Sequence, residues 1–335
     1  MIYSILDTDL YKFTTSYAYI KLFPYASGTF SFTDRDQTVC SDHFLAELKE
    51  AIDQMRRIAL TGDELEYMTH TCLFLPRVYW EWLSSFRFQP EKVNVWLDEE
   101  RHLHMEVTDY MYKVTLYEVP LLALVSEVRN RVMGHVPDLD KVVSRLVDKV
   151  SLSNRNHLSF SEFGTRRRFS FEVHDTVIGY LKQHALYCTG TSNCYFAMKY
   201  NMKPMGTHPH EWFMFHGAQF GYKHANYMAL ENWVNVYDGD LGTALSDTYT
   251  SDAFLSNLSR KQAKLFDGVR CAFGIGTNLT NDTGFTPSNI VMKLTRCRMN
   301  NNQEWHECVK LSDDEGKHLG SSMEVKACLY ELQLG

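Results

Sequence analysis

Between residues 157 and 287 the chain alternates short runs of β-forming residues with longer stretches whose apolar residues recur at helical spacing. Parallel strands need a crossover connection, and a helix is the usual one. Repeated units of this kind predict a parallel sheet or a barrel in this part of the chain. The strand-like runs lie at 158–163 and 243–248, and helices are expected at 169–184, 191–200, 211–236 and 253–266.

The two ends of the chain show a different pattern, in which strand-like segments dominate. Residues 28–33, 93–97 and 103–107 are rich in β-formers, and similar runs return at 289–294 and 307–311. We therefore expect an α/β protein in which both chain ends build a β-rich domain beside a barrel-like middle.

Charge, hydropathy and cysteine usage exclude several classes of protein. The 335 residues include 34 Lys and Arg against 41 Asp and Glu, and this net charge of −7 does not suit a general nucleic-acid binder. The longest strictly apolar run, Val119–Val125, has seven residues, whereas a membrane span needs about 18. The first residues include Asp7 and Asp9 and no basic segment, so they do not read as a signal peptide. Eight cysteines without a CxxC pair are typical of reduced thiols, and we expect a cytoplasmic protein without structural zinc and with no nucleic-acid or membrane partner.

The motif SEFGTRRR (161–168) follows a predicted strand and brings three arginines to a strand-to-helix turn. Arginines at such a turn offer bidentate contacts to an anion. Cations oppose the macrodipole at a helix N-terminus, so their placement is easier to explain if an anion binds there. A solvated basic helix start is the alternative.

The motif GTHPHEWF (206–213) places His208, His210 and Glu211 after another short apolar run. One histidine could serve as a nucleophile or an acid–base group. The HxH spacing also suits a metal site, although it is not the HExxH of a metalloprotease. The third interpretation is a helix-capping loop with one buried, hydrogen-bonded histidine.

Two further motifs could supply a phosphate-binding loop and an aromatic side chain to a pocket. FGIGTNLTND (273–282) brings Gly274, Gly276 and Thr277 to a strand end, where backbone N–H groups and a hydroxyl can cradle a phosphate. It is neither a P-loop nor GxGxxG, and a turn without ligand is the alternative. TDLYKFT (8–14) holds Tyr11 at a helix start, where packing is the usual role of an aromatic ring. Together the motifs describe a pocket for a phosphorylated sugar.

In their joint order, these motifs resemble those of the nicotinate phosphoribosyltransferase family. The resemblance spans almost the whole chain and rests on TDLYKFT, VTLYEVPLLALVSE, FSEFGTRRR, GTSNCYFAMKY, GTHPHEWF, FGIGTNLTND and KLSDDEGK.

The resemblance implies a type II phosphoribosyltransferase fold, with an α/β sandwich domain and an irregular α/β barrel. The sandwich is expected from residues 1–125 and 288–335, and the barrel, with the active site, from residues 126–287. The implied reaction joins nicotinate to phosphoribosyl pyrophosphate and yields nicotinate mononucleotide and pyrophosphate in NAD salvage. ATP hydrolysis is coupled through a phosphohistidine, Mg²⁺ accompanies the phosphates, and a homodimer shares its active sites.

The resemblance also assigns roles to residues at matching motif positions. His210, which directly precedes Glu-Trp, matches the phosphorylated histidine, whereas His208 does not. Tyr11, reaching in from the neighbouring subunit, and Phe163 match the two rings that hold the base, and Arg270 matches the arginine near its carboxylate. No residue of the chain is assigned as a metal ligand. The implied phosphate-binding and neighbouring positions are Arg166, Thr207, Gly274, Gly276 and Thr277.

One feature departs from the family pattern. Here DGVR (267–270) runs directly into CAFGIGTN (271–278), whereas the family has a further stretch of several dozen residues between these segments. Loss of a βα unit would break barrel closure. We therefore expect residues missing from the printed chain after Arg270, rather than a true deletion, and treat Arg270 and Cys271 as not necessarily covalent neighbours.

Three other interpretations remain. A nicotinamide or quinolinate phosphoribosyltransferase would share the fold, although GTHPHEWF favours the nicotinate branch. A non-catalytic, ligand-binding homologue would follow from a true deletion. A metal-dependent hydrolase using His208, His210 and Glu211 predicts bound zinc or iron.

Overall fold

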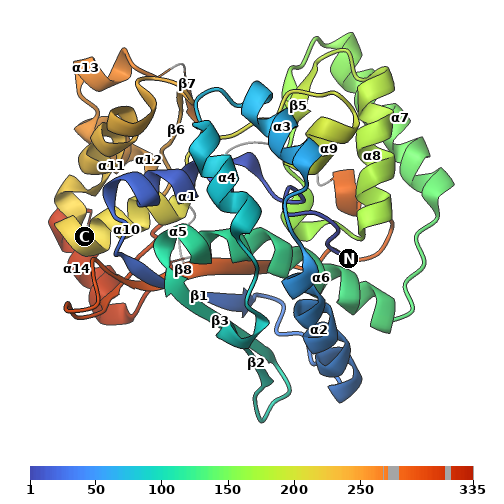
Figure 1. The fold of residues 1–335 in the computed structure, drawn as a ribbon, viewed down its shortest axis with the longest axis horizontal. Coiled ribbons are helices and arrows are strands. Elements are labelled where there is room, and N and C mark those ends of the chain that lie inside the picture. The colour runs from blue at the N-terminus through green and yellow to red at the C-terminus, as the bar shows by residue number, and fades with distance from the viewer. Residues whose placement is uncertain (267, 271–278, 314–317, 335) are drawn as a thin grey trace.

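The computed structural model describes residues 1–266, 268–270, 279–313 and 318–334, and it shows a mixed α/β fold. An antiparallel sheet lies along the lower part of the molecule in Figure 1, with α7, α8 and α9 at the upper right and α10 to α13 at the upper left. The core is built from two hydrophobic clusters, of which the smaller lies around α7 and α8.

The antiparallel sheet has five strands in the order β2-β3-β1-β8-β9. The central strand β1 therefore lies between a strand from the first third of the chain and one from its last fifth. Phe30, in β1, faces Val107 on one side and Leu294 on the other. Both chain ends build this sheet, as the sequence predicts. The strands are β1 (Ser27–Asp34), β2 (Val93–Leu97), β3 (Leu103–Tyr110), β8 (Ile290–Arg298) and β9 (His306–Glu307).

Both ends of the chain also supply helices, of which α2, α5 and α6 contact the sheet. The spacing of Thr61 and Glu64 is typical of a capping box, and the structure confirms it, because each side chain bonds the backbone N–H of the other residue. The helices are α1 (Leu10–Leu22), α2 (Asp42–Gln54), α3 (Gly62–Thr71), α4 (Arg77–Ser85), α5 (Met111–Val114), α6 (Glu118–Val132) and α14 (Ser322–Leu332).

The middle of the chain carries parallel strands in two pairs, β4 with β5 and β6 with β7. Parallel pairing confirms the prediction from the alternating pattern. The strands are β4 (Phe160–Glu162), β5 (Cys188–Thr191), β6 (Thr243–Leu245) and β7 (Gly268–Arg270). The helices are α7 (Leu139–Arg155), α8 (Phe171–His184), α9 (Cys194–Lys199), α10 (His210–Phe220), α11 (Tyr222–Tyr237), α12 (Ser251–Asn257) and α13 (Arg260–Ala263).

The long helix expected at 211–236 is wrong in one respect, because the chain forms two helices that meet at Gly221. Gly221 has φ +83°, a backbone conformation that favours glycine, and its N–H bonds the carbonyl of Gly217 at 3.0 Å. The Glu331 carboxylate from α14 then accepts hydrogen bonds from the N–H groups of Tyr222 and Lys223, at 2.7 and 3.2 Å. A distant carboxylate therefore caps the start of α11.

Two shorter predictions also change. The stretch expected as a helix at 191–200 begins as the end of β5, and only Cys194–Lys199 is helical. Of the strand expected at 307–311, only Glu307 lies in a strand, the short β9. Both segments are short, so periodicity gives a weak signal for them.

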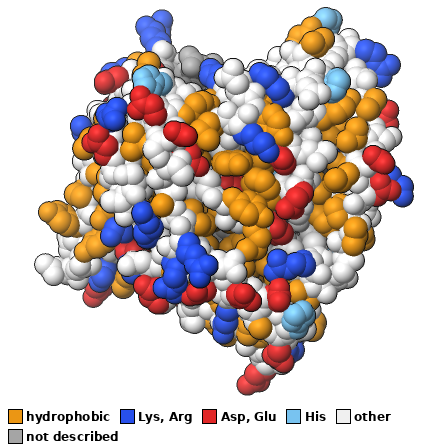
Figure 2. Space-filling view, turned by 45° about the vertical axis from the view of Figure 1, so that its right-hand side comes forward, with side chains coloured by type: hydrophobic (Ala, Val, Ile, Leu, Met, Phe, Trp, Pro, Cys, Tyr) orange, Lys and Arg blue, Asp and Glu red, His pale blue; other side chains and the backbone are white. Residues whose placement is uncertain are grey.

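The surface has charged and apolar regions. Figure 2 shows hydrophobic side chains gathered in the middle of one face, below a notch between two lobes. Leu73, in the α3–α4 connection, and Val78, near the start of α4, are 81% and 66% exposed. Within the described ranges, no helix has the length and apolar character needed to cross a membrane.

Candidate active site

The described candidate residues gather around the C-terminal ends of parallel strands. Phe163 and Arg166 come directly after β4, and Thr207 and His210 follow a parallel bridge to the end of β5. Enzymes with parallel sheets bind their ligands at this edge. We therefore take this edge as the candidate active site.

The N-terminal segment runs along this edge and brings α1 to it. Asp9 forms an antiparallel bridge with Asn193, and the N–H of Leu10 bonds the carbonyl of Ser192 at 2.8 Å. The helix α1 begins at this contact. Tyr11, its second residue, is buried beside the site.

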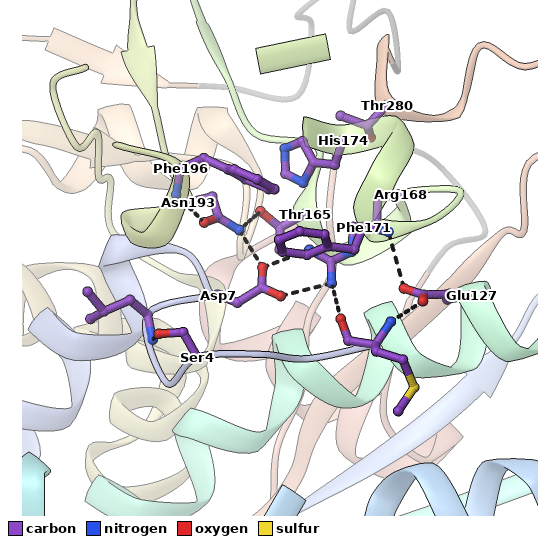
Figure 3. A network of polar contacts seen from close by, with 12 residues as sticks. Ser4, Asp7, Glu127, Thr165, Arg168, Phe171, His174, Asn193, Phe196 and Thr280 are labelled. Carbon is purple, nitrogen blue, oxygen red and sulfur yellow. Dashed lines mark hydrogen bonds and ion pairs between the residues drawn. The ribbon is translucent and has the colours of Figure 1, made fainter. Parts of the chain in front are cut away.

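A buried polar network holds the turn that follows β4 (Figure 3). The guanidinium of Arg168 donates to both carboxylate oxygens of Asp7, at 2.7 and 2.9 Å, and to the carbonyl of Met1 at 3.1 Å. Asn193 donates to Asp7 at 2.8 Å and to the hydroxyl of Thr165 at 3.2 Å. These bonds join the N-terminal segment, the turn after β4 and the end of β5 into one unit.

The three consecutive arginines therefore separate in the structure, although the sequence suggested one group of anion contacts. Arg168 is fully buried in its pair with Asp7. Arg167 donates to the carbonyl of Ile290 at 3.0 Å. Arg166 remains one-third exposed, at 3.7 Å from Glu118, and it is the arginine that the resemblance assigns to phosphate.

Tyr11 and Arg166 of the same chain are electrostatic neighbours. Burial raises the pKa of Tyr11 well above its ordinary value, and Arg166 opposes that shift. Tyr11 is in turn the largest cause that raises the pKa of Arg166. The ammonium of Lys12 lies 5.2 Å from the centre of the Tyr11 ring, and Phe163 is half-buried after β4. Tyr11 and Arg166 thus influence each other's pKa within one chain.

A buried ion cluster surrounds Lys12, the residue that follows Tyr11 on α1. The ammonium of Lys12 contacts the carboxylates of Glu118, at 2.5 Å, and of Glu211. The hydroxyl of Thr115 also donates to Glu211 and lies 3.4 Å from Lys12. Three segments far apart in the chain, around residues 12, 118 and 211, therefore meet at one cation.

The second carboxylate oxygen of Glu118 extends this cluster toward the site. It lies 3.7 Å from Arg166 and 3.9 Å from the ammonium of Lys293 in β8. Burial disfavours the ionised form of Glu118, but Lys12, Lys293 and Arg166 outweigh it and lower its pKa to about 2. Burial, with the nearby cations, lowers the pKa of Lys293 to about 7. We call Lys12, Glu118, Glu211, Arg166 and Lys293 the Lys12 cluster.

His210 is the first residue of α10 and faces the end of β6. Its Nδ1 lies 3.0 Å from the hydroxyl of Thr248, and its Nε2 lies 3.9 Å from the carboxylate of Asp247. A helix N-terminus favours negative charge, so this end of α10 suits a bound anion. Thr207 is buried, and its hydroxyl donates to the carbonyl of His208 at 3.3 Å.

His208 has a different environment. Its ring is buried among aromatic side chains, with the Trp233 ring centre at 4.4 Å and the Phe213 ring centre at 5.8 Å. Burial lowers the pKa of His208 to about 3. Glu211 is engaged by Lys12, so the three residues of the metal-hydrolase interpretation face different surroundings. No group of three or more potential metal-binding His, Cys, Asp or Glu side chains occurs in the part of the chain that the structure describes.

Comparison with known proteins identifies the family. The nicotinate phosphoribosyltransferase N-terminal domain model matches residues 6–126, and the nicotinate phosphoribosyltransferase family model matches residues 158–271. A nicotinate phosphoribosyltransferase of Chromohalobacter salexigens is 39% identical over 96% of this chain and 95% of its own length. The chain belongs to the nicotinate phosphoribosyltransferase family. It is accordingly an enzyme of NAD biosynthesis, as the resemblance predicts.

Solved structures of the family agree with the fold. The nicotinate phosphoribosyltransferase of Porphyromonas gingivalis superposes with a TM-score of 0.97 at 42% identity, covering 99% of this chain and 100% of that one. The enzyme from Vibrio cholerae superposes with a TM-score of 0.91 at 26% identity, covering 100% of this chain and 95% of that one. The mixed α/β fold is therefore that of nicotinate phosphoribosyltransferases.

The length of the family alignment bears on the junction after Arg270. The alignment with a nicotinate phosphoribosyltransferase of Desulforapulum autotrophicum, 36% identical, spans 391 positions and covers 100% of both chains, whereas this chain has 335 residues. About 56 positions thus have no counterpart here. The second family match ends at residue 271, beside that junction. That the missing positions lie between Arg270 and Cys271 stays a prediction.

Some candidate positions of this nicotinate phosphoribosyltransferase family member fall outside the described residues. The phosphate cradle expected at Gly274, Gly276 and Thr277 lies there, as does Cys271. Arg270 is the last residue of β7, which pairs in parallel with β6, so its backbone lies at the C-terminal end of this second parallel pair.

Sequence reasoning missed the Lys12 cluster. Each of its residues Lys12, Glu118 and Glu211 lies within a motif on which the family resemblance rests. The three motifs are about a hundred residues apart in the chain. Periodicity reports only local spacing, so it carries no signal for such a contact. The sequence signal that was available is the presence of ionisable residues inside otherwise apolar helix segments, as in LYKFT and YEVPLL.

Proposed function

We propose that this chain transfers the phosphoribosyl group of phosphoribosyl pyrophosphate to nicotinate, forming nicotinate mononucleotide and pyrophosphate in NAD salvage. The observation that carries the proposal is the placement of Phe163 and Arg166 directly after β4 and of His210 in the segment that bridges the end of β5, in a chain related to this family over its whole length. Two alternatives, a nicotinamide and a quinolinate phosphoribosyltransferase, use the same fold with a different base.

The transfer passes through an oxocarbenium-like centre at the sugar C1, so the enzyme acts mainly by positioning and by neutralising charge. Tyr11 and Phe163 hold the pyridine ring, and Arg270 lies near its carboxylate. A carboxylate-seeking arginine favours the acid over nicotinamide. Arg166 takes a phosphate, and the loop with Gly274, Gly276 and Thr277 cradles the sugar phosphate.

ATP is coupled through phosphorylation of His210. The bond between the γ-phosphorus of ATP and its bridging oxygen breaks, ADP leaves, and an N–P bond to the imidazole forms. The contact of Nδ1 with Thr248 and the nearby Asp247 orient the ring for this step. The phosphoryl group adds about −1.5 to −2 charges, by analogy with other phosphorylated residues.

Mg²⁺ accompanies the phosphates of the substrates. Magnesium prefers a few carboxylate ligands combined with substrate phosphates and water. The carboxylate of Asp247, near the phosphoryl acceptor, is a donor of this type. When bound, the ion would neutralise the charge of the leaving phosphates.

The finer architecture follows the family. We propose an α/β sandwich domain from residues 1–125 and 288–335, and an irregular α/β barrel from residues 126–287. The five-stranded sheet shared by both chain ends supports the first, and the parallel pairs β4–β5 and β6–β7 support the second. We also propose a homodimer with shared active sites, in the cytoplasm. The exposed apolar side chains of Leu73 and Val78 support an interface with another chain.

The direct test is an assay of the purified protein with nicotinate and phosphoribosyl pyrophosphate, with and without ATP, using mass spectrometry to detect the mononucleotide. We expect nicotinate mononucleotide, formed faster with ATP. A clear preference for nicotinamide or quinolinate under the same conditions would contradict the assignment to nicotinate.

A second candidate function, a non-catalytic ligand-binding homologue, is favoured by the alignment positions that have no counterpart here. The intact mass of the protein purified from its source decides between the two readings of the junction. A mass of 39.0 kDa, that of the printed chain, would show a true deletion. A mass several kilodaltons higher would show that the segment after Arg270 exists.

A further inference from the structure

Lys12 is a fully buried cation whose contacts the proposed reaction does not explain. Its side chain has no exposed surface, and it is held by Glu118 and Glu211, whose side chains are 5% and 3% exposed. Burying charges is costly, and a single cation shared by two carboxylates is not the cheapest way to fill a core. Such an arrangement calls for an explanation beyond packing.

The Lys12 cluster connects α1 and α10, the two helices that carry Tyr11 and His210 of the proposed reaction. Lys12 follows Tyr11 on α1, and Glu211 follows His210 on α10. Glu118, the third member, presents its other oxygen to Arg166. One continuous set of ion pairs therefore runs from the histidine helix, through Lys12, to the ring-binding helix and the phosphate-binding arginine.

We infer that Lys12 is a positioning residue that couples the charge state of His210 to the substrate side of the site, so that ATP use and phosphoribosyl transfer stay linked. This inference rests on the proposed function, since it assumes that His210 is phosphorylated. It assigns to Lys12 a role in coupling rather than in contact with substrate.

The physical basis is the sharing of one cation. Phosphorylation places negative charge on the residue next to Glu211, and that charge attracts Lys12 toward α10. As Lys12 moves toward α10, its contact with Glu118 weakens. The Glu118 carboxylate then interacts more strongly with Arg166 and Lys293. Binding of a substrate phosphate to Arg166 acts on the same carboxylate from the other end. Such coupling is reciprocal for binding, because it is one free energy shared by two sites.

The experiment compares Lys12→Met, which keeps the length of the side chain but removes its charge, with the wild type. Two quantities are measured, the number of ATP molecules hydrolysed per mononucleotide formed and the factor by which ATP accelerates transfer. We expect Lys12→Met to hydrolyse several times as many ATP molecules per mononucleotide formed as the wild type does. We also expect it to lose most of the acceleration by ATP.

Two further variants separate coupling from folding. Lys12→Met leaves a buried carboxylate unpaired, so the double variant Lys12→Met/Glu211→Gln restores the charge balance and tests coupling if the single variant unfolds. Arg129→Met is the matched control, because it breaks the buried pair of Arg129 with Asp34, at 2.7 Å and 8% and 4% exposed, outside this cluster. We expect it to lose stability but to keep the wild-type ATP ratio.

The outcomes are distinguishable. A folded double variant with the wild-type ATP ratio and acceleration would overturn the coupling role while leaving the proposed function intact. The same loss of coupling in Arg129→Met would also overturn it, since any buried pair would then suffice. A wild-type protein that makes the mononucleotide without any effect of ATP would overturn the ATP step of the proposed function, and with it this inference.

Discussion

Two buried charge clusters flank the candidate active site, and they are built differently. Arg168 and Asp7 form a matched pair, in which one guanidinium meets both oxygens of one carboxylate at 2.7 and 2.9 Å. In the Lys12 cluster, three cations meet two carboxylates, and Lys12 and Glu118 each have more than one partner.

This contrast indicates which cluster stabilises the fold and which can respond to ligands. A matched bidentate pair has one favourable arrangement, so it fixes the segments that carry it. A cluster with shared partners has several arrangements of similar charge balance, and part of it is exposed through Arg166 and Lys293. The following predictions test this contrast.

The largest effect is expected from breaking the matched pair. Arg168→Met leaves the carboxylate of Asp7 buried without its cation, and we expect the free energy of unfolding to fall by about 3–5 kcal/mol. Arg131→Met is the control, because its pair with Glu47 is 46% and 33% exposed and is worth at most about 1 kcal/mol. Urea denaturation of both variants checks the prediction, and equal losses would contradict it.

The next effect separates the two histidines of GTHPHEWF. We expect His210→Ala to abolish ATP hydrolysis and the acceleration by ATP, while some slow transfer without ATP remains. His208→Ala removes a ring buried among aromatic side chains, so it should cost about 2–5 kcal/mol of stability yet keep phosphorylation. Labelling with ATP that carries a labelled γ-phosphate provides the measurement. Label retained in His210→Ala and lost in His208→Ala would reverse the assignment.

A smaller effect tests whether the site is complete in one chain. The Arg168 network fixes the N-terminal segment against its own chain, whereas the proposed dimer shares Tyr11 with the pocket of the partner. Mixing inactive Tyr11→Ala and Phe163→Ala chains should recover at most about a quarter of wild-type activity, because half of randomly paired dimers contain one intact site. Size-exclusion chromatography checks that subunits exchange. Well-mixed heterodimers without activity would place Tyr11 in the pocket of its own chain.

The smallest effect distinguishes the two lysines of the Lys12 cluster. The pKa of Lys293 is lowered to about 7, chiefly by burial, so its amine is mostly neutral at pH 8 and can attack an acylating reagent. Burial opposes the charge on Lys12, but Glu118 and Glu211 outweigh it and raise its pKa, so Lys12 stays charged and unreactive. We expect brief acylation at pH 8 to modify Lys293 before Lys12, with little modification of either at pH 6. Peptide mass spectrometry gives the order, and modification of Lys12 first would contradict the contrast.

Much of the fold could be predicted from local patterns. The alternation of buried and half-exposed residues along Leu103–Tyr110 marks a strand with one packed face, and the sequence shows it. The capping box of Thr61 and Glu64 is equally local. The break at Gly221 was missed, because the helical spacing continues across it, and its cap comes from Glu331, about a hundred residues later.

The candidate site, like the fold, could be predicted only in part from local patterns. From the sequence alone the motifs, the family and the candidates His210, Tyr11, Phe163 and Arg166 could be predicted, because these residues lie in short segments whose order is characteristic. The sequence did not separate the roles of Arg166, Arg167 and Arg168, which are consecutive in the chain.

The packing of the folded chain shows that Arg168 is buried against Asp7, whereas Arg166 stays partly exposed. It also brings Lys12 between Glu118 and Glu211. An ion pair depends on distance and burial in space, and segments separated by about a hundred residues meet only when strands and helices pack. Local spacing determines which faces exist, and packing determines which charges share a face.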